Sequence, residues 1–172
     1  GRPIGGFWGF NYYKDIFFEE RIYNQDNDYL FEIYNGLELF GSRNHNFGKF
    51  FSSNHNVRYA MKFFNRKVVV EPDSLDIFSN AIPESGKEGS ISLTYTFTNK
   101  RPNINNMYVP RNGYGIQLEG NLIDKNIWGD FSYKHYNIDG YINKGFGPAT
   151  LYLRGRYEKI SGQPPAQETA GL

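Results

Sequence analysis

The sequence predicts an all-β fold, a single-domain antiparallel meander of about seven strands. Aromatic residues make up 18% of the 172-residue chain, well above ordinary globular usage, and they recur in regular bursts. Within these bursts large apolar side chains alternate with polar or small ones, the period of a strand with one apolar and one polar face. No window of a dozen residues combines an apolar stripe at helical spacing with capping signals, so no helix is predicted.

Seven segments carry this alternation. In chain order they are 5–14, 29–39, 57–64, 91–98, 114–122, 128–142 and 149–158. The clearest is 91–98, where large apolar residues occupy every odd position and small hydroxyl residues every even one. The first and sixth segments are less regular. Stretches rich in turn residues separate the strands, at 24–28, 41–56, 71–89, 99–113, 124–126 and 143–148.

The apolar face can meet either a protein core or lipid. A soluble sandwich or small barrel buries that face, whereas a membrane barrel turns it to lipid and lines its lumen with the polar face. Several segments run to ten or more residues, enough to cross a bilayer at a tilt. We therefore expect a transmembrane barrel, with the soluble β-domain as the alternative. The lipid-facing candidates are Ile91, Leu93, Tyr95, Tyr114, Ile116, Leu118, Leu151, Leu153 and Tyr157. The lumen-facing candidates are Arg58, Lys62, Gln117, Glu119, Arg154, Arg156 and Glu158.

Composition excludes several function classes. A formal net charge of +1 disfavours a nucleic-acid partner held by phosphate neutralisation. The chain has no Cys, which excludes disulfides, thiolate metal sites and a Cys nucleophile. His45, His55 and His135 lack the spacing of metal ligands, and Glu19-Glu20 would point to opposite faces of a strand. We therefore expect no catalytic residues, no metal and no cofactor.

The C-terminal half resembles a known family. Leu93 to Thr98, then Pro102, Pro110 and Gly113, form a strand, a turn and a restart that resemble those of the BamA/TamA-type outer-membrane assembly and translocation barrels, the bacterial surface antigens. Residues 130–141, 151–157 and 162–165 are similar to the family's next strands and the approach to its inward-folding loop. The turn departs from the family pattern, because an insertion separates the two prolines and Asn112 stands where Arg is usual. The resemblance covers about residues 91–172, and residues 1–90 fit by pattern only.

The resemblance implies a bacterial outer-membrane protein without covalent chemistry. Residues 1–172 would form one partial barrel domain, about seven strands of a larger barrel, with no separate periplasmic repeat domain in this chain. The implied partners are outer-membrane lipid, the remaining strands of the barrel or other subunits of an assembly complex, and client polypeptides. Two alternatives stay open. One is a passive porin-like or small ligand-binding barrel. The other is a lipid-modifying enzyme, which would need Ser, His and an acid convergent at one rim.

Overall fold

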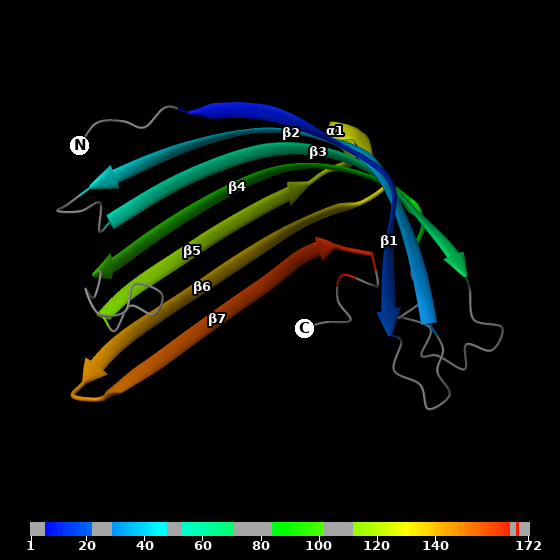
Figure 1. The fold of residues 1–172 in the computed structure, drawn as a ribbon. Helices are drawn as coiled ribbons and strands as arrows, with labels where there is room; N and C mark the ends of the chain where they lie inside the picture. Colours follow the sequence, from blue (N-terminus) through cyan, green and yellow to red (C-terminus); the bar gives the residue numbers. More distant parts are fainter. Residues whose placement is uncertain are drawn as a thin grey trace.

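The computed structural model describes residues 6–21, 29–47, 53–70, 84–101, 112–165 and 168. They form one antiparallel sheet of seven strands, each paired with its neighbours in the chain (Figure 1). The strands are β1 (Phe7–Arg21), β2 (Tyr29–Phe47), β3 (Ser53–Val70), β4 (Gly86–Arg101), β5 (Asn112–Ile123), β6 (Ser132–Phe146) and β7 (Ala149–Gln163). The predicted all-β meander is therefore confirmed. The sheet is open, with β1 and β7 at its edges.

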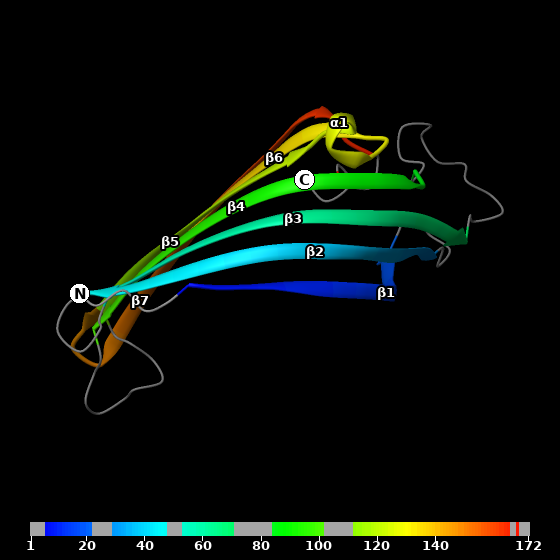
Figure 2. The same cartoon turned by 90° about the horizontal axis from the view of Figure 1, so that it is seen from above.

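The sheet is curved and twisted along its whole length (Figure 1, Figure 2). Pro165, two residues beyond the end of β7, is fully buried. No helix in the described part of the chain is long and apolar enough to cross a membrane.

Alternation gives the sheet two chemically different faces, as predicted. One ladder row joins Tyr59, Leu93, Gly120 and Tyr136, whereas the adjacent row joins Arg58, Thr94, Glu119 and Asn137. We call these the apolar face and the polar face. The predicted lipid-facing candidates all lie on the apolar face, and the predicted lumen-facing candidates all lie on the polar face.

Burial is inverted relative to a compact globular protein. Most large residues of the apolar face are exposed, and the buried apolar residues among those described are Ala60, Ile123, Phe131 and Tyr133. The accessible surface is 12198 Å² for a 19.9 kDa chain. A compact protein of that mass exposes about 8,700 Å². The sheet therefore presents a large apolar surface that nothing in the described chain covers.

The turns differ most from prediction in two places, and elsewhere the strands extend a few residues into the predicted turns, as where β4 begins at Gly86 and β6 ends at Phe146. The segment 41–56 was predicted as a turn, but β2 continues to Phe47 and β3 begins at Ser53. Asn side chains usually favour turns, but here they bond to each other across the ladder, Asn54 donating to Asn46 and Asn56 to Asn44.

The second difference is a one-turn helix, α1 (Lys125–Trp128), where only a turn was predicted. Its N-cap Asp124 accepts a hydrogen bond from the Asn126 amide at 2.8 Å. The helix packs against β4, and the next residues return to that strand through the Asp130 amide, which donates to the Lys87 carbonyl at 2.8 Å.

Glycines allow close approach at several points of the sheet. A Cβ on Gly36 of β2 would lie 2.3 Å from the Phe63 carbonyl oxygen and 2.6 Å from Cδ1 of Phe64 on β3. By contrast, a Cβ on Gly155 of β7 would meet nothing within 4 Å. The β6–β7 hairpin turns through Gly147, whose φ of +54° favours glycine.

We expect Gly36→Ala to destabilise the sheet by about 1–3 kcal/mol, because the neighbouring backbone cannot yield as a flexible side chain can. The matched control Gly155→Ala should be neutral or slightly stabilising, since it removes only backbone entropy of the unfolded chain. Denaturant unfolding in detergent micelles, followed by intrinsic fluorescence, measures both. Equal stability of the two variants would contradict the close β2–β3 approach.

Candidate functional site: the polar face

The concave polar face encloses an open hollow of about 710 Å³. Residues from β1 to β6 and Glu168 line it, and all of the strand residues among them belong to the polar face. Among the predicted lumen-facing residues, Arg58, Lys62, Gln117 and Glu119 line this hollow. Arg154 and Arg156 line a smaller one on the same face, toward β7.

Glu38 on β2 organises the first cluster of the polar face. Its side chain is buried, with 4% of the residue exposed. It accepts hydrogen bonds from Asn11 Nδ2 at 2.8 Å, Tyr13 OH at 3.0 Å and Arg58 Nη2 at 2.8 Å. Lys62 lies opposite it in the β2–β3 ladder. Three donors on a buried carboxylate compensate the loss of its hydration.

Arg66 on β3 organises the second cluster. The residue is 6% exposed, and its guanidinium lies over the Tyr34 ring at 5.1 Å. Its Nη2 contacts the carboxylates of Glu168 and, at 3.5 Å, of Glu88. Tyr133 OH donates to Glu88 at 3.2 Å. The cluster thus joins β3, β4, β6 and the segment after β7.

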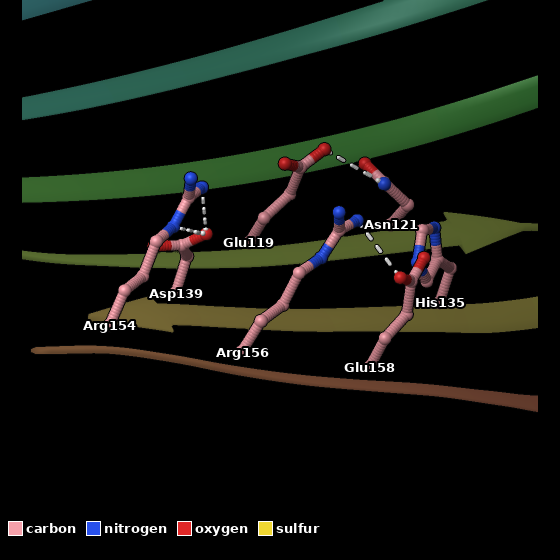
Figure 3. A network of polar contacts seen from close by, with 7 residues as sticks. All are labelled: Glu119, Asn121, His135, Asp139, Arg154, Arg156 and Glu158. Carbon is pink, nitrogen blue, oxygen red and sulfur yellow. Dashed lines mark hydrogen bonds and ion pairs between the residues drawn. The ribbon is translucent and has the colours of Figure 1, made fainter. Parts of the chain in front are cut away.

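The third cluster lies on β5, β6 and β7 (Figure 3). Arg154 Nε donates to both oxygens of Asp139, at 3.0 and 3.1 Å. Glu158 accepts from Arg156 Nη2 at 2.9 Å and lies 2.6 Å from His135 Nε2. Both arginine side chains are more than half exposed, so each pair contributes little to stability.

His45 and His55 lie elsewhere than predicted. They are not turn residues but face each other across the β2–β3 ladder on the apolar face. His55 Nδ1 lies 2.7 Å from Tyr95 OH, and its ring is 4.6 Å from that of Phe97. No group of three His, Asp or Glu in the described ranges could hold a metal ion.

The sequence reasoning missed the centres of the two buried clusters. Glu38 stands between two leucines on an alternating strand, and that pattern indicates its face but not its three donors. Arg66 and Glu168 are 102 residues apart, and no local pattern connects them. In the family turn motif, Pro102 and Pro110 lie outside the described residues, and Gly113 is the second residue of β5.

Comparison with known proteins leaves the chain without an assigned family. No family model, curated protein or solved structure matches it. Any assignment of function therefore depends on the residues of this chain and their arrangement.

Replacing Glu38 tests the first cluster. We expect Glu38→Ala to lower the free energy of unfolding by about 1–3 kcal/mol, because Asn11, Tyr13 and Arg58 lose a shared acceptor. The matched control Arg154→Ala, which breaks an exposed pair on the same face, should leave stability nearly unchanged. Denaturant unfolding of both variants in micelles is the measurement. A larger loss for Arg154→Ala than for Glu38→Ala would be the contrary result.

Proposed function

We propose that this chain supplies seven consecutive strands to the wall of a transmembrane β-barrel in the bacterial outer membrane. The apolar face would meet lipid, and the polar face would line a water-filled lumen. One observation carries the proposal. The band of apolar residues crosses the sheet obliquely, at an angle and a height close to those of a membrane barrel.

Four exposed lysines of the apolar face mark one limit of the band. They are Lys67 on β3, Lys87 on β4, Lys134 on β6 and Lys159 on β7. Each lysine can be traced through its ladder row to a position on β3. Lys87 pairs directly with Asn65. The row of Lys134 leads through Leu122 and Ile91 to Met61, and the row of Lys159 leads through Tyr136, Gly120 and Leu93 to Tyr59. Measured on β3, the limit moves from position 67 to 59, a shift of eight residues over four strand steps.

The opposite limit is inclined the same way. Arg43 on β2 pairs with Val57, and Asn99 on β4 pairs with Ser53. Lys144 on β6 lies two residues beyond Ile142, which the ladder joins to Ser53 through Tyr114 and Asn99. Counted in the register of β3 and extended two residues beyond Ser53, this limit shifts by six residues over four strand steps.

These shifts give a tilt. With about 3.3 Å per residue and about 4.8 Å between strands, they correspond to strands inclined by roughly 45–55° to the band normal. The strands of membrane barrels tilt by about 35–45°. On β6, ten residues separate Lys134 from Lys144, which is about 33 Å along the strand and about 23 Å when projected at 45°. The apolar band of outer-membrane barrels is about 25 Å tall.

The charges that bound the band also favour lipid over a soluble sandwich. On β2 to β7, the charged side chains described on the apolar face are all basic: Arg43, Lys67, Lys87, Lys134, Lys144 and Lys159. A solvated protein surface mixes both signs, whereas lysines at a membrane boundary extend toward anionic headgroups.

For the complete barrel we propose assembly or translocation of other polypeptides without covalent chemistry. This part depends on the resemblance of residues 91–172 to the BamA/TamA-type barrels. The edges β1 and β7 support a multi-part barrel, because an exposed sheet edge is not tolerated in lipid. Its partners would be lipid, further strands or subunits, and client polypeptides.

Spin labels test the membrane placement. We expect labels at Leu118 and Leu153 to be accessible to oxygen from the hydrocarbon, and labels at Gln117 and Arg154 to be accessible to a water-soluble relaxing agent. The neighbouring positions of each pair are matched controls for local strand mobility. Hydrocarbon contact at Gln117 and Arg154 would reverse the proposed faces.

The oblique band predicts depth as well. Met61 and Ile138 should be the deepest positions of their strands, midway between the limits of the band. Val57 shares a ladder row with Ile138 but should lie about 9 Å nearer the interface, from four residues at about 3.3 Å each and a 45° tilt. Equal depths for Val57 and Ile138 would refute the oblique band.

Reconstitution tests the activity. Proteoliposomes that contain the complete barrel should accelerate the folding of a denatured outer-membrane client, measured by its gel-mobility shift. Protein-free liposomes of the same lipids are the control. A passive porin would raise ion conductance without accelerating folding, and that outcome would favour the alternative.

A further inference from the structure

Arg66 has the features of a carboxylate receptor. It lies on the wall of the 710 Å³ hollow, and its guanidinium is held against the Tyr34 ring. A planar guanidinium can bind a carboxylate through two parallel hydrogen bonds. Only Nη2 is engaged by the carboxylates described, and among the described residues no acceptor reaches Nε or Nη1. The fork is therefore not saturated by its present partners.

The occupant of this receptor comes from the chain itself. Glu168 follows β7, and its carboxylate reaches Arg66 four strands away. Its amide donates to the Pro165 carbonyl at 3.0 Å, so the side chain is presented from a short turn next to a buried proline. Glu168 is thus a tethered ligand rather than part of the sheet.

Glu88 makes the occupant exchangeable. If Glu168 leaves, Arg66 still has the Glu88 carboxylate 3.5 Å from its Nη2, so no buried cation is left unpaired. Tyr133 holds Glu88 in place through a hydrogen bond of 3.2 Å. Loss of Arg66 has a different effect, because two carboxylates would then face each other without a cation. Arg66 is therefore a fixed component and Glu168 a replaceable one.

We propose that Arg66, supported by Tyr34 and Glu88, is a carboxylate-binding site for acidic polypeptide segments, and that Glu168 occupies it until such a segment displaces it. The inference rests on the proposed function, which makes the polar face the lining of a polypeptide-conducting lumen. The hollow is open to the concave side, and Arg58 and Lys62 line it together with Glu38, Glu88 and Glu119, so the selectivity for a carboxylate comes from Arg66 itself. The ligand class is a peptide with Glu or Asp side chains.

Peptide binding to the full chain in detergent micelles tests the site. The probe is a fluorescein-labelled, Glu-rich decapeptide, and fluorescence anisotropy reports its affinity. We expect Glu168→Gln to bind the peptide at least tenfold more tightly than the wild type, because a tethered competitor at high effective concentration has been removed. The same peptide with Gln in place of Glu should not bind to either protein.

Two further variants make the result specific to Arg66. Added to Glu168→Gln, Arg66→Lys keeps the charge but loses the fork, and should reverse the gain in affinity by at least tenfold. Glu158→Gln, which removes a carboxylate of the polar face that does not contact Arg66, should bind like the wild type. Equal binding by the wild type and Glu168→Gln, or undiminished binding by the Arg66→Lys double variant, would overturn the proposal.

The measurement separates this inference from the membrane proposal. Anisotropy in micelles does not depend on which face meets lipid. Correct label accessibility without Arg66-dependent binding would overturn the carboxylate site alone. Arg66-dependent binding with reversed label accessibility would overturn the membrane placement alone.

Discussion

The structure depends on one constraint, the alternation of side chains along strands that have only a small apolar cluster, around Ile123, Phe131 and Tyr133, behind them. In an ordinary sheet one face packs against a second layer, and burial of that face is the main stabilising term. Here Leu93 and Leu153 are more than half exposed, whereas Glu38 and Arg66 are buried. The polar face therefore holds most of the side-chain hydrogen bonds of the described residues, whereas most large side chains of the apolar face remain exposed. A stable environment for the sheet must therefore cover these exposed apolar side chains.

Much of the fold was predictable because alternation is local. The segment 91–98 shows its period within eight residues, and the register of β4 with β5 then follows from the need to keep each face uniform. The prediction failed at 41–56, where Asn and His satisfy the turn composition. Asn44 and Asn56 become strand residues only because each finds the other across the ladder, and a one-dimensional pattern does not reveal that partner.

The sequence was enough to predict which residues line the polar face, but not which of them contact each other. The alternation of side chains along each strand is enough to assign Arg58 and Arg154 to the polar face. The alternation cannot indicate that Arg58 meets the buried carboxylate of Glu38, whereas Arg154 meets a half-buried one, because burial depends on how the sheet curves. The contact between Arg66 and Glu168 was harder still to predict, because Glu168 follows a pair of prolines in a segment whose sequence shows no alternation. Curvature brings Glu168 within reach of Arg66 on β3, and curvature is a property of the whole sheet.

The two faces of the sheet also differ in how their charges are arranged. On the polar face, carboxylates and cations occur close together, so Arg66, Arg154 and Arg156 each contact at least one acid. On the apolar face of β2 to β7 the described charges are only cations, and they stand at the two limits of the apolar band. Ion pairing within the polar face leaves a wet surface without a strong net field. No acid among the described residues pairs with the side chains of these cations, and in the proposed membrane placement phosphate headgroups at two levels about 23 Å apart would supply the anions.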